Sequence, residues 1–320
     1  MIGSNLVKRL AIAGERVSVV DNLWRGRREY LLDERGAPVI EMEQDFHQRD
    51  LSQTGALDDL IDGIDIVYHL ADVVGGIGFV FNNESAVFRQ NMLINSNVIA
   101  ACRKNGVSGF VYTGTACSFP AELQNDIDAP PLRECDQYPA NPESAYGWSK
   151  LMGEYEALLM EKETGIPVSV LSLHNVFGSP CDFTAETSQV IPALIRKAVL
   201  SPEEPFVVWG SGSQGRAFVH VDEVVDALIA TMDKGLGQGV IQIGPDRCTS
   251  IAEVAHEIVR ISGKHIDIEF DNSKPEGDRG RCADFSKATE ILGWTPRHML
   301  SADLEALYRW VEREIRKLAD

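Results

Sequence analysis

The amino-acid sequence predicts an α/β protein built on a doubly wound parallel sheet, with a smaller, mostly helical C-terminal lobe. The first observation is that short β-branched runs alternate with amphipathic stretches up to Gly178. Such alternation is typical of parallel strands covered by helices on both faces. The second is that the pattern becomes less regular and more helical after Gly178. The 320 residues, of which 44% are hydrophobic, are enough for one large domain or two closely joined ones.

Four short apolar runs are predicted as the buried strands of the sheet: residues 17–21, 64–69, 109–113 and 168–173. Apolar residues at helical spacing predict helices between these strands, over 85–104 and 149–163. After Gly178 we predict helices over 189–200, 221–233, 251–261 and 302–318, and strands near 206–209 and 217–220. These later elements form the predicted lobe and the last part of the sheet.

The charge balance narrows the classes of partner. The chain carries 30 Lys and Arg against 48 Asp and Glu, a formal net charge of −18. A field of that sign repels polyanions, so we expect neither nucleic acid nor an acidic membrane surface as a partner. A small phosphorylated ligand is still compatible, because a few local arginines can bind it.

Targeting signals, cysteines and histidines point to an ordinary cytoplasmic protein. We find no apolar run of membrane-spanning length and no signal peptide. The cysteines are scattered and form no CxxC pair, so we expect reduced thiols: Cys102, Cys117, Cys135, Cys181, Cys248 and Cys282. The seven histidines show no HxxxH or HExxH spacing, so we expect no metal site.

The first twenty residues indicate a nucleotide site. Gly3 and the amphipathic segment after it are similar to the last third of a GxxGxxG phosphate loop and its helix. We expect the preceding strand and first two glycines, roughly ten residues, to lie upstream of this chain. The alternative is an N-terminal glycine that happens to precede a helix. Asp21 ends the next strand, where an acidic residue binds the adenosine ribose and favours NAD over NADP. Arg25, Arg27 and Arg28 weaken that preference, because arginines accommodate a 2′-phosphate.

The strongest catalytic signal is the pair Tyr146 and Lys150, which share one face of a predicted helix. A lysine ammonium near a phenol favours the phenolate, so such a tyrosine takes a proton from a sugar hydroxyl while NAD takes the hydride. The alternative is a helix start with a surface lysine. Thr115, just past the strand 109–113, is predicted to polarise the same oxygen; otherwise it is a turn residue.

Several motifs together resemble the extended short-chain dehydrogenase/reductase family: residues 146–150, 174–178, 209–216, 218–222 and 293–294. Within that family three segments most resemble GDP-mannose 3,5-epimerase: 71–78, 115–120 and 276–281. The resemblance implies a Rossmann domain that binds NAD, over 1–178 with 206–245. It also implies a lobe that binds the nucleotide sugar, over 179–205 with 246–320, and a homodimer formed through the helix after Ser85 and the helix bearing Tyr146.

The resemblance implies a role for each residue that matches a family motif. The catalytic residues are Tyr146, Lys150, Thr115 and an acid/base cysteine, Cys117. The residues expected to bind NAD are Gly3, Asp21, Asn22, Asp50, Leu51, Leu70, Ala71, Thr113, Tyr146 and Lys150. The residues expected to bind the sugar nucleotide are Gly76, Gly78, Asn175, Gln214, Arg216, and Arg279 or Arg281 for the diphosphate.

One departure from the subfamily leaves the reaction open. The 3,5-epimerase pairs its cysteine with a lysine, but residues 179–195 contain none; Asp182, Glu186 and His174 are possible substitutes that do not align. Cys117 is alternatively a packing residue. The alternatives are therefore a UDP-sugar 4-epimerase, which needs no cysteine, and an inactive NAD-binding scaffold, which would be expected to lose Tyr146 or Lys150. A 4,6-dehydratase is disfavoured, because it would carry Asp-Glu in place of Ala116-Cys117.

Overall fold

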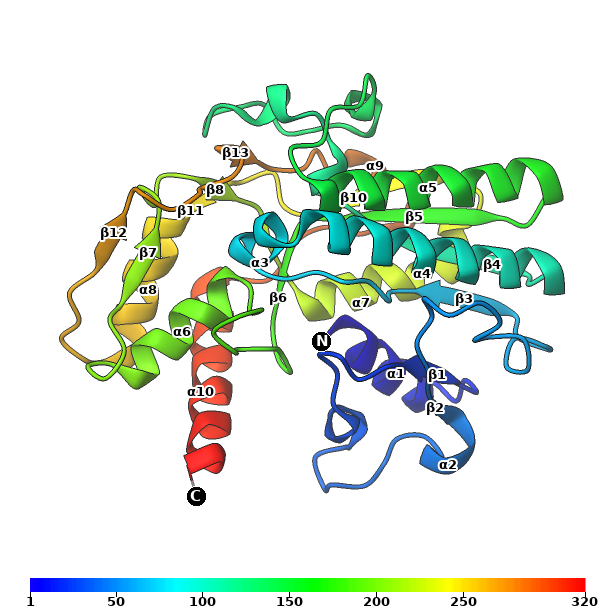
Figure 1. Cartoon of the computed structure of the whole chain (residues 1–320), viewed down its shortest axis with the longest axis horizontal. Helices are drawn as coiled ribbons and strands as arrows, with labels where there is room; N and C mark the ends of the chain where they lie inside the picture. Colours follow the sequence, from blue (N-terminus) through cyan, green and yellow to red (C-terminus); the bar gives the residue numbers. More distant parts are fainter. Residues whose placement is uncertain (320) are drawn as a thin grey trace.

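The computed structural model, which describes residues 1–319, confirms the doubly wound parallel α/β fold (Figure 1). Its largest sheet has four parallel strands in the order β10-β5-β4-β3. These are β10 (Gly239–Ile243), β5 (Val168–Leu173), β4 (Gly109–Thr115) and β3 (Ile66–His69). Three of them match predicted strands to within two residues at each end, whereas β10 was not predicted.

Helices bury both faces of this sheet. On one face lie α4 (Glu84–Asn105) and α5 (Ala145–Thr164), side by side, as Figure 1 shows. On the other lie α1 (Ile2–Ile12), α7 (Val221–Ala230) and α9 (Ser286–Leu292). The strands therefore have apolar side chains on both faces, which is why they read as continuous apolar runs in the sequence.

Two further parallel strands form a separate sheet that is not hydrogen-bonded to the large one. Strand β1 (Val19–Asp21) pairs in parallel with β2 (Phe46–Gln48) and with no other strand among residues 1–319. In the same residues β3 pairs only with β4. The pair β1–β2 is held by packing instead, because α1 lies against α7 and Val7 joins Phe46 and Leu31 in a small core.

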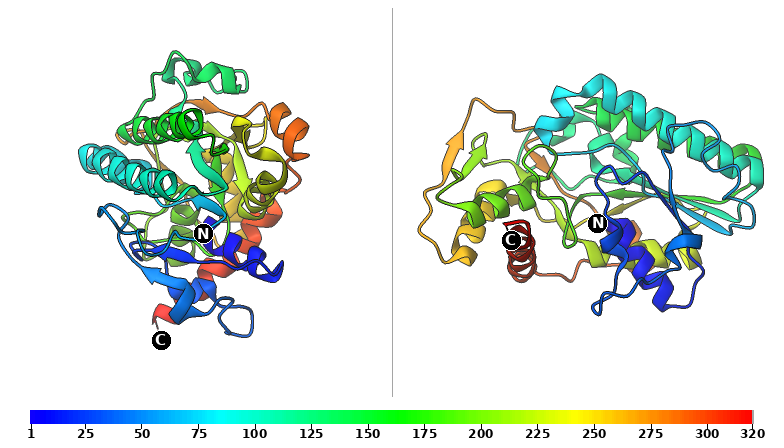
Figure 2. Two further views of the ribbon diagram at one scale, coloured as in Figure 1. Left: turned by 90° about the vertical axis from the view of Figure 1, so that its right-hand side faces the viewer. Right: turned by 60° about the horizontal axis from the view of Figure 1, so that its bottom comes forward.

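The lobe has a core of its own. Helices α6 (Val190–Leu200), α8 (Ile251–Ser262) and α10 (Leu300–Ala319) pack together beside the parallel strands β7 (Val207–Trp209) and β12 (Glu269–Asp271). Figure 2 shows this group on one side of the molecule and the large sheet with α4 and α5 on the other. Phe206 and Val208 belong to the lobe core, although the predicted boundary placed 206–245 in the nucleotide domain.

Short strands connect the two parts and were largely missed. The structure adds β6 (Asn175–Phe177) paired with β9 (Phe218–His220), and a three-stranded sheet of β11 (Thr249–Ser250), β8 (Gly215–Arg216) and β13 (Gly280–Arg281). It also adds α2 (Met42–Asp45) and α3 (Ile77–Asn82). Strands of two or three residues carry too little periodicity to be recognised in a sequence.

The small sheet explains why one expectation about cysteines is wrong. Cys248 precedes β11 and Cys282 follows β13, and both strands pair with β8. The two residues form a disulfide, with Cα atoms 5.6 Å apart and a sequence separation of 34 residues. Spacing alone does not reveal such a pair, because the sheet brings the two segments together. Cys102, Cys117, Cys135 and Cys181 are free.

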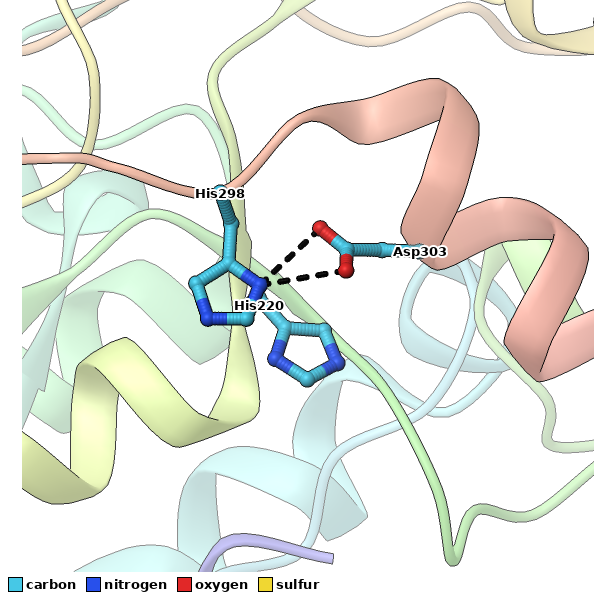
Figure 3. Close-up of side chains that lie close together, drawn as sticks. All are labelled: His220, His298 and Asp303. Carbon is cyan, nitrogen blue, oxygen red and sulfur yellow. Dashed lines mark hydrogen bonds and ion pairs between the residues drawn. The ribbon is translucent and has the colours of Figure 1, made fainter.

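A cluster of two histidines and an aspartate joins α10 to the start of α7 (Figure 3). His298 Nδ1 lies 3.1 Å from both carboxylate oxygens of Asp303, and its ring stacks on that of His220 with centroids 4.4 Å apart. Ring-nitrogen lone pairs lie in the ring planes, and those planes are within 15° of parallel. The stacked rings therefore link the end of β9 to the segment before α10, and the ion pair of His298 with Asp303 joins that segment to α10 itself.

No helix within residues 1–319 is both long enough and apolar enough to cross a membrane.

Candidate active site

A cavity of about 1640 Å³ lies between the ends of the parallel strands and the lobe. The last residues of β1, β3 and β4, namely Asp21, His69 and Thr115, all line it. This is the position where open α/β sheets bind ligands, outside the carboxyl ends of their strands. Every residue predicted for the site lines the cavity except Arg279, which is exposed and lies outside it. Arg281 is therefore the better placed of the two arginines proposed for the diphosphate.

The first turns of α5 present Tyr146 and Lys150 to the cavity. Ser144 caps this helix, since its side chain accepts a hydrogen bond from the Gly147 amide. The Tyr146 hydroxyl donates to Asp72 Oδ2 at 3.1 Å, and Lys150 Nζ lies 3.6 Å from the same oxygen. Lys150 is buried and also lies over the ring of Tyr112. Asp72, which the sequence interpretation did not select, thus bridges the two predicted catalytic residues.

This bridge opposes the expected activation of Tyr146 by Lys150. Burial, followed by the nearby charge of Asp72, raises the pKa of Tyr146 well above its ordinary value. Burial lowers the pKa of Lys150, although the Asp72 carboxylate opposes the shift. The ammonium is paired with a carboxylate rather than left free to stabilise the phenolate. The phenol therefore stays protonated while Asp72 holds both groups.

We expect Asp72→Asn to move the pH dependence of turnover to lower pH. Asparagine keeps an oxygen that accepts from the Tyr146 hydroxyl but removes the negative charge that raises the pKa of Tyr146. If turnover requires the phenolate, activity falls as the pH drops below that pKa, so the acidic limb of the pH profile follows it. A profile of kcat against pH for both proteins measures the shift, and coincident acidic limbs would contradict the role of Asp72.

Thr115 and Cys117 come from the tight turn that follows β4. Thr115 is the last residue of that strand, and its Oγ1 accepts a hydrogen bond from the Cys117 amide at 3.2 Å. Its neighbours Ala116 and Ser118 are buried, whereas Cys117 is partly exposed in the cavity. A Cβ atom at Gly147 would collide with the Cys117 carbonyl, so this glycine lets the turn pack against the start of α5.

Gly76 and Gly78 allow the loop after β3 to approach the lobe closely. A Cβ at Gly76 would lie 2.5 Å from the carbonyl oxygen of Ser188, and one at Gly78 would lie 2.6 Å from the ring of Trp209. The Gly76 amide donates to the carbonyl of Thr187 at 3.2 Å. Both glycines line the cavity, but their clearest effect is to bring its two walls together.

Two buried arginines form the far end of the cavity. Arg216 donates to the carbonyls of Gly215 and Asp278, and Arg281 Nη1 lies 3.0 Å from Asp278 Oδ2. Burial, with the charge of Arg281 second, lowers the pKa of Arg216 to about 10, so both arginines are cationic at neutral pH. Arg281 Nε and Gln214 Oε1 are buried without a partner among the described residues. A guanidinium pair with unused donors suits a diphosphate.

The opposite end of the cavity fits the adenosine half of a dinucleotide. Asp21 uses Oδ1 to accept from the Leu23 amide, which leaves Oδ2 without a partner in residues 1–319. The N-terminus of α1, with Gly3, faces the same space, and a helix N-terminus attracts phosphate. Arg25 is bound to Asp182 and to the Val74 carbonyl, so it does not offer a free site for a 2′-phosphate.

The remaining residues predicted to bind the cofactor shape this end of the cavity. The side chains of Asn22 and Asp50 each accept a hydrogen bond from the backbone amide of the second residue after them. The Thr113 hydroxyl donates a hydrogen bond to the carbonyl of His69. Leu51, Leu70 and Ala71 supply apolar lining. Asn175, which is predicted to contact the sugar nucleotide, lies in β6 and also lines the cavity.

The three proposed substitutes for the absent lysine differ in their surroundings. His174 is buried and bonded to Gln242, and burial lowers its pKa to about 4. Asp182 is held by Arg25 and by Thr187. Glu186 lines the cavity and is exposed. Asp182 is therefore not free to exchange protons with a ligand, whereas Nδ1 of His174 has no hydrogen-bond partner among the described residues.

Comparison with known proteins places this site in a family context. The sequence matches the NAD dependent epimerase/dehydratase family over residues 1–244. It is 31% identical to GDP-mannose 3,5-epimerase of Arabidopsis thaliana over 316 residues, which cover 99% of this chain and 81% of the relative. It is 30% identical to GDP-L-fucose synthase of Escherichia coli, with 95% of this chain and 96% of the relative covered.

Solved structures show the same fold. The UDP-glucose 4-epimerase of Thermotoga maritima, solved with UDP-glucose, superposes with a TM-score of 0.86 at 24% identity, over 98% of this chain and 96% of that one. The UDP-glucose 4-epimerase of Thermus thermophilus, solved with NAD, gives a TM-score of 0.82 at 21% identity, over 97% and 96%.

Proposed function

The chain belongs to the NAD dependent epimerase/dehydratase family, and from this premise we propose that it is a nucleotide-sugar epimerase that works through a transient 4-keto intermediate. The activity it most resembles is that of GDP-mannose 3,5-epimerase. The observation that carries the proposal is that Tyr146, Thr115 and Cys117 line one cavity, whose far end holds the arginines Arg216 and Arg281.

Each of these residues has a distinct task in the proposed cycle. Bound NAD supplies a reversible hydride acceptor. Tyr146 removes the proton from the 4-hydroxyl, Thr115 donates a hydrogen bond to the same oxygen, and Lys150 favours the charged form of Tyr146 once it is released from Asp72. The ketone acidifies the neighbouring C–H bonds, and Cys117 exchanges protons there. Arg216 and Arg281 hold the diphosphate, which fixes the sugar against these groups.

A UDP-sugar 4-epimerase is the second candidate, and the absent lysine in residues 179–195 favours it. Inversion at carbon 4 needs only Tyr146, Lys150 and Thr115, together with room for the keto sugar to turn over. The cavity, at about 1640 Å³, offers that room. Under this alternative Cys117 is a packing residue beside Gly147.

Deuterium incorporation separates the two candidates. The protein, supplied with NAD, is incubated in deuterated water with GDP-mannose and, separately, with UDP-glucose, and the products are analysed by NMR. Deuterium at carbon 3 or 5 of the mannose supports the 3,5-epimerase. Inversion at carbon 4 without deuterium supports the 4-epimerase, and unchanged sugars in both reactions would contradict the proposed function.

We also propose that the protein is a homodimer formed through α4 and α5. Four large apolar side chains on these adjacent helices are exposed: Phe88 and Leu93 on α4, and Tyr155 and Leu159 one turn apart on α5. Neighbouring exposed apolar residues are typical of a subunit interface. Light scattering on the purified protein, compared with Leu159→Glu, tests this proposal, because a charge there would favour the monomer.

A further inference from the structure

One carboxylate in the cavity has no role in the cycle described above. Glu143 lies in the segment before α5, three residues ahead of Tyr146, and its side chain lines the cavity. Its Oε2 accepts a hydrogen bond from the Asp278 amide at 3.2 Å, which anchors the side chain beside the arginine pair. Its Oε1 makes no hydrogen bond within residues 1–319. Glu143 is thus held at one oxygen and free at the other.

Four other carboxylates that line the cavity are already bound. Asp72 holds Tyr146 and Lys150, Asp182 holds Arg25, and Asp278 pairs with Arg281. Glu276 accepts from the Ser211 amide. By contrast, Glu143 forms no ion pair in the described part of the chain, so its carboxyl can gain and lose a proton without breaking one.

Glu143 and Cys117 border the same region. A Cβ at Gly147 would meet both the Cys117 carbonyl and the ring of Pro142, so the cysteine turn packs directly against the segment that carries Glu143. The charges of both Cys117 and Glu143 act on the guanidinium of Arg281 and on that of Arg216. A ligand whose diphosphate meets these arginines therefore has two proton-carrying groups beside it, one from each segment.

The pKa of Glu143 is shifted in the direction that a general acid needs. Partial burial, with the charge of Asp278 second, raises the pKa of this carboxyl, while Arg281 and Arg216 oppose the shift. A general acid works best when its pKa approaches the working pH. The raised value brings Glu143 closer to that condition than an ordinary glutamate.

We propose that Glu143 is the second acid/base residue of this site and acts with Cys117 on opposite faces of the sugar, in place of the lysine that the chain lacks. The inference rests on the proposed epimerase function. The Cys117 thiolate takes a proton from a carbon next to the 4-keto group, and the C–H electrons pass into an enolate whose charge lies on the carbonyl oxygen. The Glu143 carboxylic acid gives its proton to the other face of that carbon, which restores the ketone and inverts the centre. Exchange with water then reprotonates Glu143 and deprotonates Cys117.

The test compares wild type, Glu143→Gln and Cys117→Ser with GDP-mannose and NAD in deuterated water, by NMR. Glutamine keeps an oxygen for the Asp278 amide, so the fold is preserved, which melting followed by circular dichroism checks. We expect Glu143→Gln to form the epimer about 10²–10⁴-fold more slowly. Because Cys117 can still remove a proton and return a deuteron to the same face, this variant should place deuterium in unepimerised substrate. Cys117→Ser should not.

Two further variants make the outcome decisive. Glu122→Gln, an exposed glutamate outside the cavity, is the matched control and should behave as wild type. Glu186→Gln tests a different carboxylate that lines the cavity. Normal epimer formation by Glu143→Gln, or a loss confined to Glu186→Gln, would overturn the assignment while leaving the epimerase function intact. A wild type that neither exchanges nor epimerises the sugar would overturn both.

Discussion

Replacing Tyr146 by phenylalanine is expected to lower turnover by about 10²–10⁴-fold, the contribution usual for a positioned general base. The change removes only the hydroxyl that donates to Asp72 and that would take the sugar proton. The rest of the ring keeps its place in the first turn of α5. Substrate binding should change little, because Arg216 and Arg281 lie elsewhere in the cavity. The loss should therefore appear in kcat more than in KM.

Steady-state kinetics with the sugar nucleotide that wild type converts gives this measurement. Tyr138→Phe is the matched control, because Tyr138 is exposed and lies outside the cavity. Transient NADH absorbance after mixing with substrate should also disappear in Tyr146→Phe. Turnover near the wild-type value would exclude Tyr146 as the base.

Acid is expected to destabilise the fold through its buried histidines. Burial lowers the pKa of His69 to about 3 and that of His174 to about 4, from an unfolded value of 6.5. Between those values the unfolded chain binds more protons than the folded one, so stability present above pH 6.5 is lost as the pH falls. Each histidine should cost about 1.4 kcal/mol per pH unit in this window. Glu154 opposes the effect, since burial raises its pKa to about 7 and its protonation stabilises the folded state.

A difference between two proteins isolates the contribution of one histidine from that of Glu154. Denaturant unfolding of wild type and His174→Gln is measured at pH 7 and pH 5. The variant loses the contacts of the His174 ring at both pH values. It no longer has a buried histidine whose protonation destabilises the folded state. Its free energy of unfolding relative to wild type should therefore rise by about 2 kcal/mol between pH 7 and pH 5. A difference that does not change with pH would show that His174 titrates normally in the folded protein.

The parts of the fold that are periodic and local could be predicted from the sequence. Regularly spaced apolar residues are buried by the strands β3, β4 and β5 and by the long helices α4 and α5. This spacing is visible in the sequence itself. Tyr146 and Lys150 were found because their spacing places them on one helical face. The strands that join the lobe to the sheet are too short to show a period, and so β6, β8 and β13 were missed.

Contacts between distant segments account for the rest. Asp72 follows β3 and is far from Tyr146 in the sequence. Only the folded structure shows that its Oδ2 lies 3.1 Å from the Tyr146 hydroxyl. The predicted effect of Lys150 on Tyr146 is opposed by the same carboxylate, which pairs with the ammonium. The disulfide of Cys248 with Cys282 depends on β11, β8 and β13 lying side by side. Glu143 is an unremarkable glutamate in the sequence, and its place beside the arginines comes from the Asp278 amide.

The separation of β1 and β2 from β3 has a consequence for how the molecule opens. Backbone hydrogen bonds do not join the two parts of the parallel arrangement in residues 1–319, so the unit formed by α1, β1 and β2 depends on side-chain packing against α7. Such a unit is a natural foldon, able to unfold locally at a lower free energy than the whole domain. Asp21 belongs to that unit and Lys150 to the other. A dinucleotide that contacts both Asp21 and Lys150 would couple these two parts of the molecule. The free energy of local opening would then rise as the bound fraction of the dinucleotide rises.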